Sequence, residues 1–146
     1  HKALNIFKSE KKLQGQAMIY TNLSYIHYAQ NEYSESLKYA NKCIEIDKKI
    51  KDEKGLSYPM STIVDVYIAQ KNYDKALPIQ IQTLRINQKY KNITETIGSY
   101  LRMGKIYSLM GNYELANKYI DSSLTITDNA IPEINYYKSK SELYES

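Results

Sequence analysis

The sequence of 146 residues is poor in several residue types that particular folds require. It has no Trp, one Phe, one Cys, three Pro and five Gly, and Val occurs only at positions 64 and 66. A buried parallel sheet is built from runs of Val and Ile, and a many-stranded sandwich or barrel needs frequent turns marked by Gly and Pro. The composition therefore disfavours both doubly wound α/β folds and many-stranded β folds.

Other absences argue against several classes of function. Apolar runs are only a few residues long, against the roughly 20 that span a bilayer, so no membrane contact is predicted for this stretch. The net charge is only +4 and no block of five or six like charges occurs, so no nucleic-acid partner is predicted. The only His residues are His1 and His27, and the single cysteine is Cys43. These are too few for the usual metal sites, and we predict no metal, no cofactor and no enzyme activity within these residues.

Tyrosine is the residue in excess, with 16 copies, and its positions show a period in the chain. Tyr33, Tyr73 and Tyr113 are 40 residues apart, and so are Ile46, Ile86 and Ile126. Such a fixed period is the signature of a repeat architecture. Within each period the apolar residues fall at helical spacing in two successive segments, which predicts a helix–turn–helix unit.

The pattern predicts an all-α chain of eight helices. Asn31 and Gly111 suit the left-handed conformation that ends many helices, whereas Lys71 does not, which predicts mild strain or a different turn there. The predicted helices span residues 2–13, 16–30, 33–53, 57–70, 73–91, 95–110, 113–127 and 131–145.

The third unit shows the pattern most clearly, with Tyr100, Met103-Gly104, Tyr107, Gly111-Asn112-Tyr113, Ala116, Ile120 and Ser123. It resembles a tetratricopeptide repeat (TPR), and the resemblance implies a right-handed superhelix of antiparallel helices, an α-solenoid. His27 and Cys43 stand where that pattern has a packing tyrosine and a small packing residue, so both are expected to be packing residues.

The whole chain, 1–146, is interpreted as one TPR domain. The repeats are assigned to residues 16–53, 57–91 and 95–127, with half-repeats at 2–13 and 131–145. Half-repeats at both ends lead us to expect a fragment of a longer protein, and a homodimer formed through these ends is one arrangement that they allow.

The resemblance implies a non-catalytic module that binds a protein or peptide. Repeats of 40 residues are similar to those of sensor histidine kinases in two-component systems of the Bacteroidetes, where the array has a sensory or scaffold role. Two alternatives remain open: a Rap-type regulator controlled by a peptide, and a scaffold attached to an enzyme outside these residues. The first interpretation implies a periplasmic or otherwise extracytoplasmic location, and the Rap-type alternative a cytoplasmic one.

The family's geometry points to a concave face formed by the first helix of each unit. Exposed tyrosines on such a face offer contact area at low entropic cost, which favours partner binding there. The competing interpretation is a solvated wall with the binding site elsewhere. The candidate residues are Thr21, Tyr25, Tyr28, Tyr58, Ser61, Asp65, Ile68, Leu101, Arg102, Lys105 and Ser108.

Overall fold

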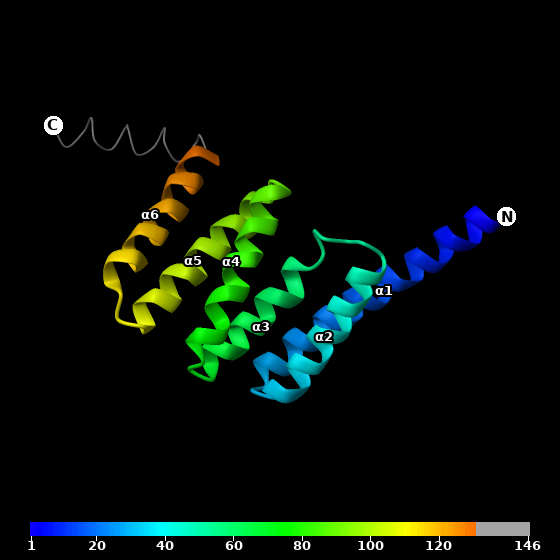
Figure 1. Ribbon diagram of the computed structural model, residues 1–146, viewed down its shortest axis with the longest axis horizontal. Helices are drawn as coiled ribbons and strands as arrows, with labels where there is room; N and C mark the ends of the chain where they lie inside the picture. Colours follow the sequence, from blue (N-terminus) through cyan, green and yellow to red (C-terminus); the bar gives the residue numbers. More distant parts are fainter. Residues whose placement is uncertain (131–146) are drawn as a thin grey trace, which may run out of the picture. The chain divides into compact units, whose positions relative to one another are not determined.

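The computed structural model describes residues 1–130, and this part of the chain consists of helices and the turns between them (Figure 1). The described residues form six helices joined by short turns, which confirms the all-α prediction. These helices are α1 (Lys2–Ala29), α2 (Tyr33–Lys49), α3 (Ser57–Ala69), α4 (Tyr73–Lys89), α5 (Ile93–Leu109) and α6 (Tyr113–Ala130).

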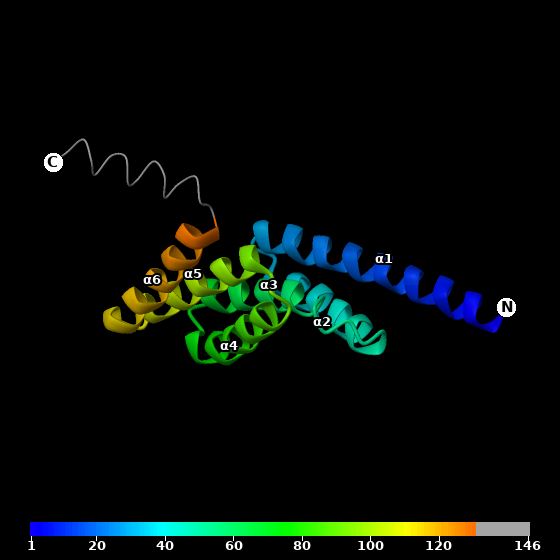
Figure 2. The same ribbon diagram turned by 90° about the horizontal axis from the view of Figure 1, so that it is seen from above.

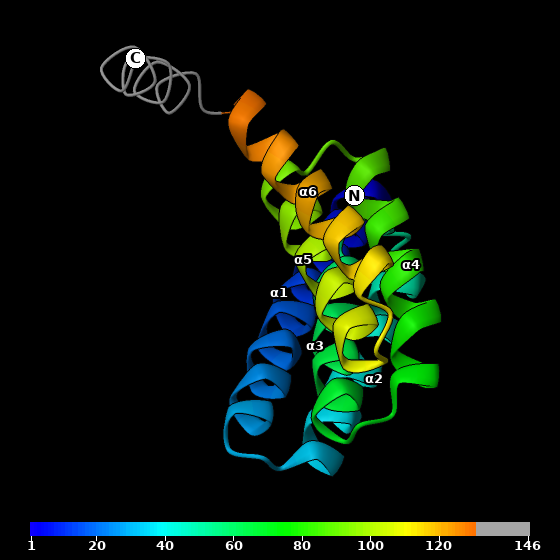
Figure 3. The same ribbon diagram turned by 90° about the vertical axis from the view of Figure 1, so that its left-hand side faces the viewer.

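The helices belong to two compact units, of which the first is His1–Ile86 and the second begins at Asn87. In the first unit α1 packs against α2, and both contact α3. The ammonium of Lys75 on α4 lies 5.7 Å from the centre of the Tyr67 ring on α3, so these two helices also face each other. In the second unit α5 and α6 form a hairpin (Figure 3).

All five turns that follow helices α1 to α5 contain a residue in the left-handed conformation, at intervals of 20 residues. After α3, Lys71 has a φ of 58°. The amide of Asn72 donates to the Tyr67 carbonyl at 2.8 Å, and the amide of Lys71 donates to the Ile68 carbonyl at 2.9 Å. This pair of hydrogen bonds defines the Schellman motif, and equivalent pairs close the other four turns. The left-handed residues are Asn31, Lys51, Lys71, Lys91 and Gly111.

These turns explain several differences from the predicted boundaries. The helix predicted to reach residue 53 ends at Lys49, because Lys51 is left-handed. The helix predicted to begin at residue 95 begins at Ile93, because the side chain of Asn92 accepts a hydrogen bond from the Glu95 amide as its N-cap. The last described helix continues to Ala130. The helix predicted at 131–145 lies outside the described residues.

The break predicted between residues 13 and 16 is wrong, because α1 is one helix of 28 residues. A glycine inside a helix weakens it without ending it, and Gly15 is not among the left-handed residues. The first half of α1 therefore extends past α2 (Figure 2), with Leu4, Ile6 and Phe7 more than half exposed.

Stacked rings hold the first and last hairpins together. Tyr39 on α2 lies between two rings of α1, with centroid distances of 5.8 Å to Tyr20 and 5.3 Å to His27. Two repeats later, Tyr119 on α6 stacks in the same way on two rings of α5, those of Tyr100 and Tyr107. The half-buried His27 thus takes a tyrosine's place in the packing, as the repeat pattern predicts.

Small residues let the paired helices approach closely. In the first hairpin the hydroxyls of Ser24 and Ser36 are buried, and each donates to the other residue's carbonyl, at 2.9 and 2.8 Å. In the last hairpin Gly104 replaces Ser24, and a Cβ atom placed there would lie 2.8 Å from Cγ1 of Ile120. Bulkier residues at these places would force the helices apart.

Candidate functional site

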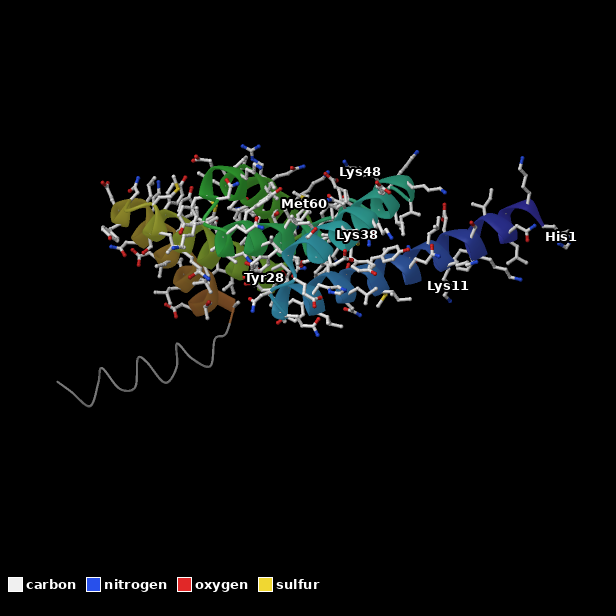
Figure 4. All side chains as sticks on the ribbon, turned by 90° about the horizontal axis from the view of Figure 1, so that it is seen from below. His1, Lys11, Tyr28, Lys38, Lys48 and Met60 are labelled. Atoms are coloured by element: carbon white, nitrogen blue, oxygen red, sulfur yellow. The ribbon has the colours of Figure 1, made fainter. Side chains whose placement is uncertain are left out.

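A pocket of about 400 Å³ opens in the first unit between α1, the end of α2 and the start of α3. Two of the predicted face residues, Thr21 and Tyr58, line it. Figure 4 places Lys48 near one end of the α1–α2 hairpin and Tyr28 near the other. The pocket is lined by Gln14, Ala17, Met18, Thr21, Asn22, Cys43, Asp47, Asp52, Gly55 and Tyr58.

The segment between α2 and α3 forms part of the wall of this pocket. Pro59 has no amide hydrogen, and its ring crowds the carbonyl four residues earlier, at Gly55. The chain from Glu53 to Tyr58 follows i-to-i+3 hydrogen bonds instead of α-helical ones, and α3 begins only at Ser57. At Gly55 a Cβ would lie 2.6 Å from Oδ2 of Asp52 and 3.3 Å from Cγ of Asp47, so the glycine lets the backbone lie against both carboxylates.

Asp47 is a buried carboxylate in the wall of the pocket. Its side chain is only 3% exposed, and burial raises the pKa of its carboxyl group above the ordinary value. The Cys43 thiol opposes this pKa shift with a weak hydrogen bond of 3.4 Å to Oδ2, while the charge of Asp52 adds to it. Within residues 1–130 this thiol is the only hydrogen-bond donor to the Asp47 carboxylate.

The equivalent residue of the next repeat is Asn87, and its side-chain amide has two acceptors within the protein. Its side-chain amide donates to Oγ of Ser99 at 3.0 Å and to the Glu95 carbonyl at 3.3 Å. Forty residues earlier, the places of Glu95 and Ser99 are taken by Gly55 and Pro59. A carboxylate can only accept hydrogen bonds, so Asp47 cannot make the bonds that Asn87 makes.

Cys43 is buried, as its place in the repeat predicts, with 1% of its surface exposed. Its Sγ lies 3.1 Å from Oγ1 of Thr21 and 3.4 Å from Oδ2 of Asp47. Burial, the largest effect, together with the charges of Asp47 and Asp52 raises the pKa of the thiol to about 12. Since the thiolate is the nucleophile, Cys43 is a packing residue and a weak donor at neutral pH.

The other predicted residues of the first unit differ in exposure. Tyr25 is 62% exposed, and its ring centre lies 6.4 Å from that of the half-buried Tyr28. Ser61 and Ile68 are buried and present little surface to a partner, and Asp65 is half-buried.

In the second unit the predicted residues follow one stripe of α5. Leu101, Lys105 and Ser108 are exposed at spacings of four and three residues, and Arg102 beside them is half-buried. This spacing places the three exposed side chains on one helical face. The role of this stripe in binding stays a prediction.

The sequence analysis missed the acidic side of the pocket, formed by Asp47 and Asp52. A signal for it exists in the repeat itself, because position 47 carries Asp where position 87 carries Asn. The charge difference is visible by aligning the units, but the burial of Asp47 and the Cys43 thiol as its only donor among the described residues are visible only in the structure.

Two further properties concern residues 1–130 alone. They contain no group of three or more His, Cys, Asp or Glu side chains placed to hold a metal ion. None of their helices is long and apolar enough to cross a membrane.

Comparisons with known proteins agree with the repeat pattern. Two family models, both described as Tetratricopeptide repeat, match residues 16–49 and 58–129, together more than half of the chain. The fold is similar to the crystal structure of the TPR domain of FLU from Arabidopsis, with a TM-score of 0.73 and 14% sequence identity. The similarity covers 80% of this chain and 98% of that domain. A comparison with curated proteins finds no match.

Proposed function

The chain belongs to the tetratricopeptide-repeat family, and we propose that it is a non-catalytic module that binds a peptide segment of another protein. Repeats of this family generally mediate protein–protein interaction. The observation that carries the proposal is the pocket in the first unit, because Thr21 and Tyr58 line it. Tyr25 and Tyr28 extend the same face of α1, four and seven residues beyond Thr21.

Tyr25 is the best residue with which to test peptide binding. An exposed ring that becomes buried by a partner commonly dominates the binding energy. Peptides would be selected from a random display library on the immobilised full chain, and each would then be titrated against variants. We expect Tyr25→Ala to weaken binding by about tenfold or more.

The matched control is Tyr113→Ala, since Tyr113 is 67% exposed and lies outside the predicted face. We expect this control to leave the affinity within about twofold, as surface changes away from an interface usually do. If the library yields no peptide that prefers this chain over an unrelated helical protein of equal net charge, the proposed function is wrong.

A finer proposal concerns the protein in which the module acts. The 40-residue repeats support the sensory or scaffold region of a bacterial sensor histidine kinase in a two-component system. The flanking sequence tests this proposal: a membrane span and a kinase domain downstream support it, and a three-helix bundle upstream favours a Rap-type regulator instead. Any other catalytic domain would favour a scaffold attached to an enzyme.

Homodimerisation through the ends of the chain stays a prediction. The exposed Leu4, Ile6 and Phe7 of α1 support it. Sedimentation equilibrium of the chain and of a Phe7→Ser variant tests it. A monomer mass for the unaltered chain at about 100 μM would contradict this prediction.

A further inference from the structure

We propose that the pocket between α1, α2 and α3 binds the cationic end of a lysine or arginine side chain in the partner's peptide segment. The inference rests on the proposed function and adds the chemistry that the peptide must carry. It depends on the charge of the pocket, on a carboxylate that has a single donor among the described residues, and on the size of the pocket.

The first argument is charge. The ten lining residues include two carboxylates, Asp47 and Asp52, and no basic side chain. The chain as a whole has a net charge of +4, so the sign of the pocket is opposite to that of the molecule. A site with one sign of charge between low-dielectric walls concentrates ligands of the opposite sign.

The second argument is the incomplete hydrogen bonding of Asp47. A buried carboxylate normally accepts several strong hydrogen bonds or pairs with a cation. Here the Cys43 thiol, at 3.4 Å, is the only donor to the Asp47 carboxylate among the described residues. Asp47 also lines an open pocket. An ammonium or guanidinium group would supply both the missing donors and the opposite charge.

The third argument is size and the distribution of apolar surface. The volume of about 400 Å³ is near the lower end of the roughly 300–1,000 Å³ of ligand pockets, which fits one long side chain. Met18 and Tyr58 are 69% and 43% exposed, so they form the outer part, whereas Asp47 is buried. A methylene stem would lie along Met18, the Tyr58 ring would favour a cation nearby, and the charged end would reach Asp47.

The experiment uses the full chain and n-propylguanidinium, which has the chemical form of an arginine side chain. Its neutral analogue n-propylurea has nearly the same shape. Both compounds would be titrated by heteronuclear NMR at pH 7 and constant ionic strength. We expect the guanidinium compound to bind at least about tenfold more tightly than the urea and to shift the signals of Thr21 and Tyr58.

Variants assign this preference to the pocket. Asp47→Asn should lose about tenfold in guanidinium affinity, since a charge-assisted hydrogen bond is lost. Asp52→Asn is the second variant and keeps the acceptor for the Gly55 amide. The matched control Asp121→Asn removes an equal charge from an exposed site on α6 and should bind like the unaltered chain. Equal binding of the two compounds, or unchanged affinity in both pocket variants, would overturn the proposal.

The selected peptides separate this inference from the proposed function. If the inference is right, one lysine or arginine in each tightly bound peptide resists replacement by citrulline or norleucine, and Asp47→Asn abolishes the difference. Peptides that depend on Tyr25 but need no basic residue would leave the proposed function standing and overturn the cation pocket. Binding of n-propylguanidinium that depends on Asp47, without any selected peptide, would support the pocket's cation chemistry and contradict the peptide-binding function.

Discussion

Asp47 binds a proton more readily in the folded chain than in the unfolded one, because burial raises the pKa of its carboxyl group above 3.8. Its protonated form therefore contributes stability that is fully present below the unfolded pKa. That stability is lost as the pH rises through the folded pKa, so above the unfolded pKa the burial of this carboxyl group disfavours the folded chain.

We accordingly expect Asp47→Asn to raise the free energy of unfolding at pH 7 by about 1 kcal/mol. The amide has one possible acceptor in the Gly55 carbonyl, the counterpart of the Glu95 carbonyl to which Asn87 donates. Urea unfolding at pH 7 and at pH 3.5 measures the effect, which should shrink at the lower pH. A variant less stable than the unaltered chain at pH 7 would contradict this account of Asp47.

The thiol of Cys43 should be inert in the folded protein. Its pKa of about 12 leaves almost no thiolate at pH 8, and only 1% of the residue is exposed. Reaction with 5,5′-dithiobis(2-nitrobenzoate) should be at least about 100-fold slower in buffer than in 6 M guanidinium chloride. A Cys43→Ser variant provides the zero-reaction control, and rapid labelling of the native chain would contradict the burial.

The left-handed backbone conformation of Lys71, in the turn after α3, is energetically unfavourable. A residue with a Cβ at a φ of 58° is disfavoured by about 1 kcal/mol relative to glycine, as Gly111 at the equivalent place illustrates. We expect Lys71→Gly to raise the free energy of unfolding by about 0.5–1 kcal/mol, measured by urea unfolding.

A lysine-to-glycine substitution inside a helix should change the free energy of unfolding in the opposite direction. Lys118 is exposed within α6, and Lys118→Gly should lower the free energy of unfolding by about 1 kcal/mol. Equal effects of the two substitutions would show that the left-handed turn carries no strain.

At the scale of helices, two glycines test where close packing matters. A Cβ at Gly104 would meet Cγ1 of Ile120 at 2.8 Å and the backbone oxygen of Ala116 at 3.2 Å, so Gly104→Ala must move α5 from α6. We expect a loss of about 1–3 kcal/mol in the free energy of unfolding.

The comparison is Gly15→Ala, because a Cβ at Gly15 meets nothing within 4 Å. In the middle of α1 this change should add about 0.5–1 kcal/mol. Thermal unfolding of both variants by circular dichroism shows whether each substitution stabilises or destabilises the chain. A stabilising effect at Gly104 would contradict the close approach of α5 and α6.

The helices and their pairing were largely predictable, because the 40-residue period fixes which residues recur on equivalent faces. The break after residue 13 was wrong because the 40-residue pattern assigns residues 2–13 to a separate half-repeat, whereas the backbone continues as one helix through Gly15. The sequence named Thr21 and Tyr58 as candidate binding residues, and both line the pocket, although their role in binding stays a prediction. Asp47 could not be identified in this way, because its importance comes from its burial and from the weak thiol donor that the fold places beside its carboxylate.

At the scale of the whole molecule, repeat arrays gain their stability from contacts within a repeat and with its neighbours. All the residues that line the acidic pocket lie between Gln14 and Tyr58, inside the first compact unit. The pocket should therefore depend on α1 to α4 and be independent of α5 and α6.

A fragment of residues 1–91 tests this independence, because it ends in the turn after α4 and cuts no helix. We expect it to remain helical by circular dichroism and to bind n-propylguanidinium within about threefold of the full chain, since nearest-neighbour contacts are retained. A fragment of residues 1–52 lacks Gly55 and Tyr58 and should lose this binding. If the longer fragment also loses it while staying helical, the pocket depends on α5 or α6, and cation recognition belongs to the array rather than to its first unit.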